Sequence, residues 1–216
     1  MPSTVFAKVR NFAGGMNGIS NTLKYWLSRL ERLRKRNGYG VHSPFAYNFI
    51  KGVVYENGRY YAYGELRKRR RKRGKGERCL SGKADRLMFR IANYCRPRSV
   101  SLVGAKAALT AEYIAAATRN VPVSIYPKAG QLPTQGLQFV FCAEGEDFLT
   151  AYHITAQCAD NRTVFASAGI HSSQKNREMW RNVCNDPKAV VTFDLYELGL
   201  VFFNTNYNKQ NYTVSF

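Results

Sequence analysis

Hydrophobic residues in this sequence recur with two different periods, and the two alternate along most of the chain. Short apolar runs predict strands, and apolar positions spaced by three or four residues predict helices. The predicted strands cover residues 100–103, 121–126, 137–142, 163–166, 190–196, 200–204 and 212–216. The predicted helices between them cover residues 87–95, 109–117, 148–158 and 174–184. This order predicts an α/β fold with a Rossmann-like, mostly parallel sheet and an antiparallel C-terminal hairpin.

The part of the chain before residue 83 is predicted to be helical and strongly basic. Residues 20–36 place leucines and Trp26 on one stripe, with lysines and arginines outside it. This amphipathic helix either docks on the core through its leucines or binds anionic lipid or RNA. We therefore divide the chain into a basic helical N-terminal extension, residues 1–82, and a Rossmann-like domain, residues 83–216.

The net positive charge of the chain comes entirely from the first hundred residues. Residues 1–100 contain 24 lysines and arginines against 5 acidic residues, whereas residues 101–216 contain 9 of each. Such an asymmetry predicts a partner that is a polyanion, either nucleic acid or an anionic membrane surface. The densest run is predicted to be a solvated, mobile loop, and it serves either as a soluble linker or as a phosphate-binding segment. Its members are Arg67, Lys68, Arg69, Arg70, Arg71, Lys72 and Arg73.

Several function classes are disfavoured by missing motifs. The five cysteines are odd in number, widely spaced and never in a CxxC pair, which favours reduced thiols over disulfides or a zinc site. No run of 18 apolar residues and no apolar signal segment occurs, so we expect a cytoplasmic protein that does not span a membrane. Nucleophile-elbow, P-loop and HExxH motifs are also missing, and no metal site is predicted.

Residues 99–117 combine a predicted strand, a glycine and a predicted helix. Gly104 separates the apolar run at 100–103 from the helical pattern at 109–117. In an open α/β sheet, a ligand binds at such a junction, because the helix N-terminus directs backbone N–H groups toward the crevice beyond the strand. We therefore expect a ligand site beyond Gly104.

Four patches of the sequence resemble class I S-adenosylmethionine-dependent methyltransferases, specifically a small bacterial subfamily. They are VHSPFAYNFI at 41–50, LMFRIANYCRP at 87–97, GAKAALTAEYIAAA at 104–117, and IHSS and VVTFDLYELGLVFF within 170–203. The resemblance implies S-adenosylmethionine as cofactor and methyl transfer to an unknown acceptor. It implies cofactor contacts by Gly104, Ala105 and Ala108 in the first turn. By the same analogy His171 is near the cleft mouth, as a helix-entry residue first and a proton acceptor second.

The sequence departs from the family pattern at four acidic positions. The acid before the first glycine is Leu102, the ribose-binding acid is missing from 124–127, and Ala143 and the pair Ala168-Gly169 replace two further acidic sites. Loss of the ribose acid alone weakens cofactor affinity on the order of 100-fold, because two charge-assisted hydrogen bonds disappear. Glu144 or Glu146 either replaces a lost acid through a register shift or is a solvated loop residue.

The sequence is also short between the second and third predicted strands. Only about ten loop residues are present, fewer than a parallel crossover needs. We therefore expect the sheet to lack one strand of the family. Two functions follow as hypotheses: a degenerate methyltransferase-like protein with weak or absent cofactor binding, or a non-catalytic basic module that binds nucleic acid or an anionic surface through residues 67–73.

Overall fold

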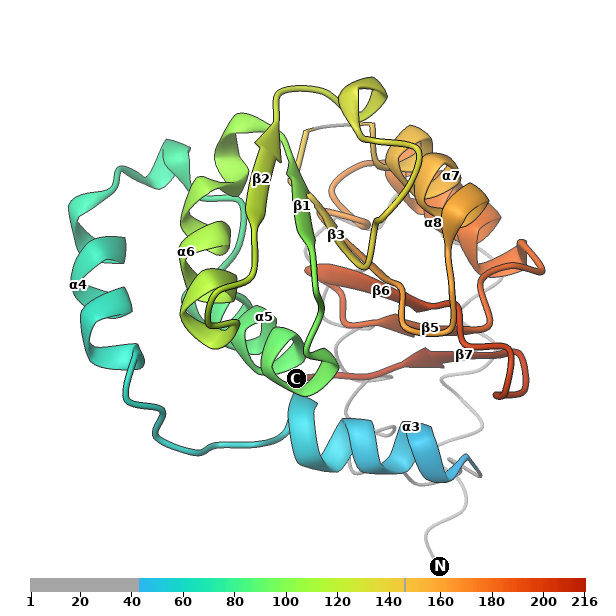
Figure 1. Ribbon diagram of the computed structural model, residues 1–216, viewed down its shortest axis with the longest axis horizontal. Coiled ribbons are helices and arrows are strands. Elements are labelled where there is room, and N and C mark those ends of the chain that lie inside the picture. Colours follow the sequence, from blue (N-terminus) through green and yellow to red (C-terminus); the bar gives the residue numbers. More distant parts are fainter. Residues whose placement is uncertain (1–42, 146) are drawn as a thin grey trace, which may run out of the picture.

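Seven strands form one sheet in the computed structural model, which describes residues 43–145 and 147–216 (Figure 1). Their order across the sheet is β2-β1-β3-β4-β6-β5-β7. All neighbouring strands are parallel except β6, which is antiparallel to both β4 and β5. The strands are β1 Val100–Val103, β2 Val123–Tyr126, β3 Phe139–Cys142, β4 Val164–Ala168, β5 Val191–Asp194, β6 Leu198–Phe202 and β7 Gln210–Thr213.

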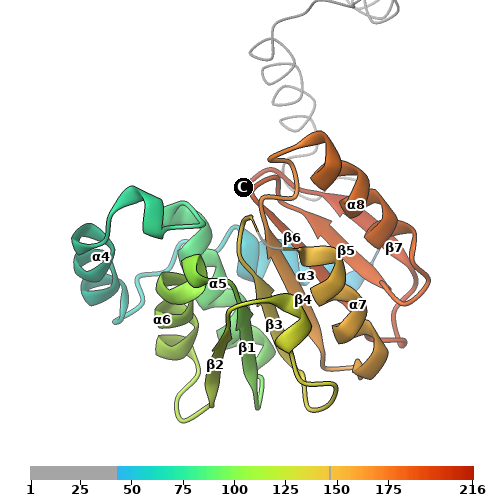
Figure 2. The ribbon, with the colours of Figure 1, turned by 90° about the horizontal axis from the view of Figure 1, so that it is seen from above.

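Helices cover both faces of this sheet, as Figure 2 shows from above. One face packs against α3, the π-helical turn η2, α5 and α6, and the other against α7 and α8. The α-helices are α3 Pro44–Phe49, α4 Tyr63–Lys72, α5 Gly82–Cys95, α6 Ala108–Ala117, α7 Phe148–Cys158 and α8 Gln174–Asn185. The shorter helical turns are η2 Ile50–Val54, η3 Lys75–Glu77, η4 Ala105–Ala107 and η5 Ala129–Gln131.

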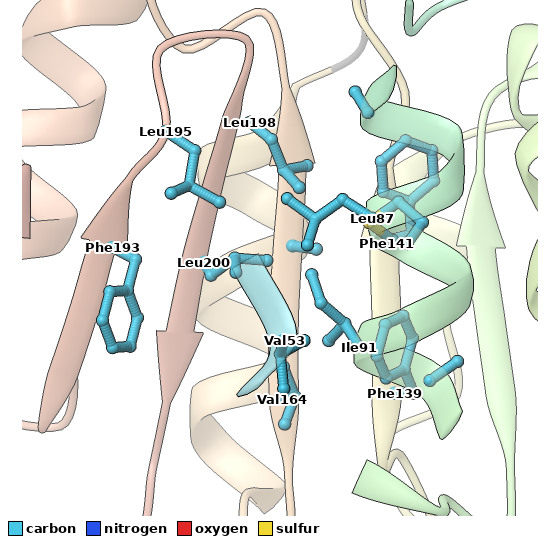
Figure 3. Close-up of a cluster of buried hydrophobic side chains, with 14 of the residues drawn as sticks. Val53, Leu87, Ile91, Phe139, Phe141, Val164, Phe193, Leu195, Leu198 and Leu200 are labelled. Carbon is cyan, nitrogen blue, oxygen red and sulfur yellow. The ribbon is translucent and has the colours of Figure 1, made fainter. Parts of the chain in front are cut away.

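Alternation along the strands divides the hydrophobic core between the two faces. In β3, Phe139 and Phe141 join the cluster under α5, whereas Val140 and Cys142 join the cluster under α7. Leu87 and Ile91 of α5 reach the same cluster as Phe139 and Phe141 (Figure 3). Each such fully buried side chain contributes about 1.5–3 kcal/mol, so this packing fixes α5 against the sheet.

The predicted fold class is confirmed. The sheet is mostly parallel, and the connection from β2 to β3 contains only the short turn η5, so the sheet is shortened where the sequence predicts it. The C-terminal details differ from the prediction. The start predicted for the strand at 200–204 is wrong, because β6 already begins at Leu198. The last strand begins at Gln210 instead of residue 212, and it pairs in parallel with β5.

The prediction of a mobile loop at 67–73 is wrong. Residues up to Lys72 belong to α4, and Arg73 is its C-cap. Leu66 of this helix is buried in a cluster with Phe89 of α5 and Tyr113 of α6. The run of cations is helical because one side of it is held against the protein, as described below.

Two further expectations concern the N-terminal part, and two others concern the cysteines and a membrane span. The helix predicted at 20–36 lies outside the described residues. The boundary at residue 82 stays a prediction, although α3 and η2 share a hydrophobic cluster with the sheet. All five cysteines are free thiols. Among residues 43–145 and 147–216, no helix combines the length and apolarity needed to cross a bilayer.

Gly199 in β6 provides a test of this packing. A Cβ atom at Gly199 would lie 2.7 Å from Cζ3 of the buried Trp180 of α8. We expect Gly199→Ala to lower the free energy of unfolding by about 1–3 kcal/mol, since it overpacks the core. Urea denaturation measures this change. The control is Gly64→Ala in α4, where an added Cβ would have no atom within 4 Å. It should leave the free energy of unfolding unchanged or raise it by up to about 1 kcal/mol. Equal stability of Gly199→Ala and wild type would contradict the packing.

Candidate functional site

The turn between β1 and α6 lies where the sequence predicts a ligand site. Gly104 has φ 95°, a conformation that L-residues rarely adopt, and its N–H donates to the carbonyl of Tyr126 at 2.8 Å. Ala105 is exposed in η4, and Ala108 is the first residue of α6. The structure therefore brings Gly104, Ala105 and Ala108 together in one tight turn, and their contact with a cofactor stays a prediction.

Glu144 follows β3, the neighbour of β1, and so lies at the same edge of the sheet. Its side chain covers Gly169 at the end of β4, where an added Cβ would meet Glu144 Cγ at 2.8 Å. Gly169 has φ 68°, so glycine is favoured there on two counts. Glu144 is thus half-buried against the neighbouring strand end; Glu146 lies outside the described residues.

The strand ends themselves are apolar. Leu102 in β1, Ala143 after β3 and Ala168 at the end of β4 are all buried, and β2 ends at Tyr126. At these four places in the described chain, no carboxylate is available to accept hydrogen bonds from a ligand. These four places lie at or near the carboxyl ends of the neighbouring strands β2, β1, β3 and β4.

Residues 78–81, which we call the strap, cross this edge between η3 and α5. Cys79 and Leu80 are buried in the same cluster as Ala107 and Ala143. Cys79 Sγ lies 3.6 Å from Thr110 Oγ1 in α6, and the N–H of Ser81 donates to the carboxylate of Glu197 in the β5–β6 turn. Burial raises the pKa of Cys79 to about 11, so the thiol is protonated at neutral pH. The strap thus connects α6 to the β5–β6 turn.

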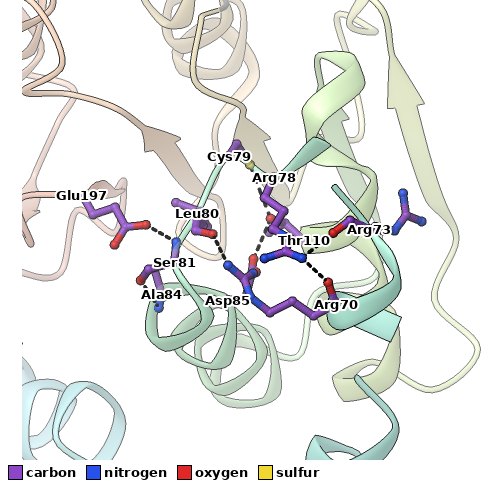
Figure 4. Close-up of polar contacts among 10 residues, drawn as sticks. All are labelled: Arg70, Arg73, Arg78, Cys79, Leu80, Ser81, Ala84, Asp85, Thr110 and Glu197. Atoms are coloured by element: carbon purple, nitrogen blue, oxygen red, sulfur yellow. Dashed lines mark hydrogen bonds and ion pairs between the residues drawn. The ribbon is translucent and has the colours of Figure 1, made fainter. Parts of the chain in front are cut away.

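A buried carboxylate anchors the strap (Figure 4). Asp85, in the first turn of α5, is 1% exposed and accepts a hydrogen bond of 2.8 Å from Thr110 Oγ1. Arg70 of α4 donates to the same carboxylate and, at 2.9 Å, to the carbonyl of Leu80. Desolvation raises the pKa of Asp85 to about 6, against the opposing effects of Thr110 and Arg70. One carboxyl group therefore joins α4, the strap, α5 and α6.

The basic run of α4 has two sides. On the side that faces the protein, Arg70 binds Asp85. Glu112 pairs with two arginines: its Oε2 lies 3.5 Å from Arg69 Nη1, and its Oε1 lies 2.5 Å from Arg73 Nη2. The other four cations lie on the opposite side of the helix, because positions i, i+1, i+4 and i+5 share one face. They are exposed, and they are Arg67, Lys68, Arg71 and Lys72. Arg70 and Arg73 are thus half-buried structural cations, Arg69 is an exposed cation with an ion pair, and the remaining four project from the outer face.

His171 forms a pair that the sequence does not reveal. Its Nε2 lies 2.7 Å from Oδ2 of Asp194, the last residue of β5, and its ring stacks on Tyr196 with centroids 5.2 Å apart. His171 precedes α8 by three residues, in line with a helix-entry role. The pair lies at the carboxyl ends of β4 and β5, with the imidazole 27% exposed. A histidine held by a carboxylate in this way is oriented for proton transfer.

Solved structures share this fold. The SAH-bound methyltransferase PaMTH1 of Podospora anserina is similar with a TM-score of 0.52 and 10% sequence identity, over 74% of this chain and 96% of that one. This chain has a methyltransferase-like fold. The O-methyltransferase TomG of Streptomyces achromogenes, solved with SAM, has a TM-score of 0.48 and 11% identity, over 81% of this chain and 99% of its own. No protein-family model and no curated protein sequence matches the chain.

The stability of this methyltransferase-like fold should depend on pH through the ionisation of Asp85. Its pKa rises from 3.8 to about 6 on folding, so the native state holds a proton that the unfolded chain releases near pH 4. The native state therefore loses stability as pH rises from about 4 to about 6, by on the order of 2–3 kcal/mol. Asp85→Asn should not show this loss.

Chemical denaturation of wild type and Asp85→Asn across pH 4–7 measures the effect. The other carboxylates are common to both proteins and cancel in the difference. We expect the stability of the variant relative to wild type to rise with pH up to about pH 6 and then to level off. If the difference in free energy of unfolding between variant and wild type stayed constant or fell from pH 4 to pH 6, Asp85 would not be desolvated.

Proposed function

We propose that this protein is a methyltransferase-like protein whose binding of S-adenosylmethionine is weak or absent. The observation that carries the proposal is the edge of the sheet at β1, β3 and β4, where buried apolar residues occupy the strand ends and the strap is buried against them. The methyltransferase-like fold and the glycine turn at Gly104 favour descent from a cofactor-binding protein.

The residues present do not fit the cofactor well. A ribose needs an acceptor for its two hydroxyl groups, and the end of β2 offers Tyr126 and Pro127 instead of a carboxylate. Asp85 is engaged by Arg70 and Thr110, and Asp194 by His171, so neither carboxylate is available. Glu144 follows the end of β3 by two residues, and its side chain packs over Gly169. We therefore derive no methyl-transfer step for this chain.

Calorimetric titration with S-adenosylmethionine and S-adenosylhomocysteine tests the proposal. We expect no binding tighter than about 100 μM, because the charge-assisted hydrogen bonds to a ribose are missing. Thermal unfolding with 1 mM of either compound provides a second readout. The rise in midpoint temperature should be no larger than that expected for a ligand present at about ten times its dissociation constant. A dissociation constant below about 100 μM for either compound would overturn the proposal and favour a cofactor-dependent methyltransferase.

A second function is favoured by the outer face of α4. Its four exposed cations project from one face of the helix, and only Lys68 among them has a described ion pair, with the exposed Glu65. We propose that this face binds a polyanion, for which RNA is the test ligand. Replacement of Arg71 and Lys72 with alanine should reduce the slope of log affinity against log salt concentration by about 1.5–2.

Filter binding to single-stranded RNA over 50–300 mM salt provides the measurement. The matched control replaces two exposed cations of α8, Lys175 and Arg181, with alanine. Anionic vesicles in place of RNA distinguish a membrane surface from nucleic acid. An equal effect of the α4 and α8 variants on RNA affinity would contradict a localised site.

A further inference from the structure

A cavity lies away from the strand ends, between the loop after η2 and the helices α4 and α5. Its volume is about 980 Å³, at the upper end of the range for sites of small molecules. Helix α5 contributes Lys83, Arg86 and Arg90, which share one stripe because they are spaced by three and four residues. Asp85 lies on the opposite side of α5, so this cavity and the strap are separated by the helix.

The cavity is lined mainly by cations and tyrosines. Five lining side chains carry a positive charge and one carries a negative charge. The cations are Arg59, Arg67, Lys83, Arg86 and Arg90; the acid is Glu56; the tyrosines are Tyr55, Tyr60 and Tyr63. This excess of positive charge in a concave site focuses the field toward an anionic ligand.

Two of the cations have structural contacts. Arg90 is 8% exposed and donates to the carbonyls of Val53 at 2.7 Å and Val54 at 3.1 Å, which satisfies the end of η2. Lys83 Nζ lies 4.9 Å from the ring centroid of Phe216. For the side chains of Arg59, Arg67 and Arg86, no hydrogen bond or ion pair is found within residues 43–145 and 147–216. Three guanidinium groups are thus available to a ligand.

Glu56 adds an acceptor to the same cavity. Its side chain is 28% exposed, and its Oε1 accepts the N–H of Gly58. Oε2 is buried, and Arg90 Nε lies 4.0 Å from it, which offsets the charge of the carboxylate. A carboxylate oxygen can accept more than one hydrogen bond, so Oε1 can also accept a ligand hydroxyl.

We propose that this cavity binds a phosphate monoester attached to a hydroxyl-bearing body, such as a sugar phosphate or a nucleotide. Arg59, Arg67 and Arg86 supply donors for the phosphate, since guanidinium groups bind phosphate oxygens in pairs. The carboxylate of Glu56 accepts a hydroxyl of the body. None of the cavity residues belongs to the strap or to the turn at Gly104, and the cavity shares only Arg67 with the outer face of α4.

Calorimetry on the full chain with four probes tests this site: ribose 5-phosphate, adenosine monophosphate, orthophosphate and adenosine. We expect both phosphate monoesters to bind, and adenosine not to bind. Tighter binding of adenosine monophosphate than of ribose 5-phosphate identifies a nucleotide as the ligand, and equal binding identifies the sugar phosphate as the recognised unit. The double variant Arg59→Gln/Arg86→Gln should weaken both by at least about ten-fold.

Two further variants keep the test specific. The control Lys175→Gln/Arg181→Gln removes the same charge from the exposed side of α8 and should leave the affinities unchanged. Glu56→Gln should weaken binding of ribose 5-phosphate but not of orthophosphate, because only the sugar has hydroxyl groups that donate to this carboxylate. Binding of adenosine as tight as that of its monophosphate, equal affinities in wild type and Arg59→Gln/Arg86→Gln, or no binding of either monoester at millimolar concentration would each overturn the proposal.

Discussion

The structure depends most on one buried ion pair, between Arg70 of α4 and Asp85 of α5. A carboxylate that is 1% exposed must be paired, because an isolated charge in the interior is very costly. Arg70 and Thr110 provide that pairing, and Arg70 also holds the carbonyl of Leu80. The pair therefore determines where α4 lies, how the strap crosses the sheet and how α6 begins.

Apolar packing and charge pairing have separate places in this methyltransferase-like fold. The sheet, the glycine turn and much of the packing of α5 and α6 rest on apolar residues and one glycine with positive φ. At the ends of β1, β3 and β4, where the sequence resemblance predicts carboxylates, this chain has the buried residues Leu102, Ala143 and Ala168. The acids Asp85, Glu112 and Asp194 instead bind arginines and a histidine of the chain itself.

The local features of the fold are predictable from the sequence, whereas contacts between distant residues are not. Helix α7 has the predicted bounds, 148–158, because its apolar spacing is a property of the segment alone. The run at 67–73 is predicted as a loop because its charges repel, and its partners are not visible in the segment: Asp85 is 15 residues from Arg70, and Glu112 is 43 residues from Arg69. The pair of His171 and Asp194 and the cavity beside Arg86 escape prediction for the same reason.

The most direct measurement of the central claim compares two neighbouring arginines. Arg70→Ala removes the partner of a buried carboxylate, and we expect the free energy of unfolding at pH 7.5 to fall by about 3–5 kcal/mol. Arg71→Ala removes the same side chain from the exposed face of α4, and its effect should stay within about 0.5 kcal/mol. Urea denaturation of the two variants decides the matter. Equal stabilities of Arg70→Ala and Arg71→Ala would contradict the account.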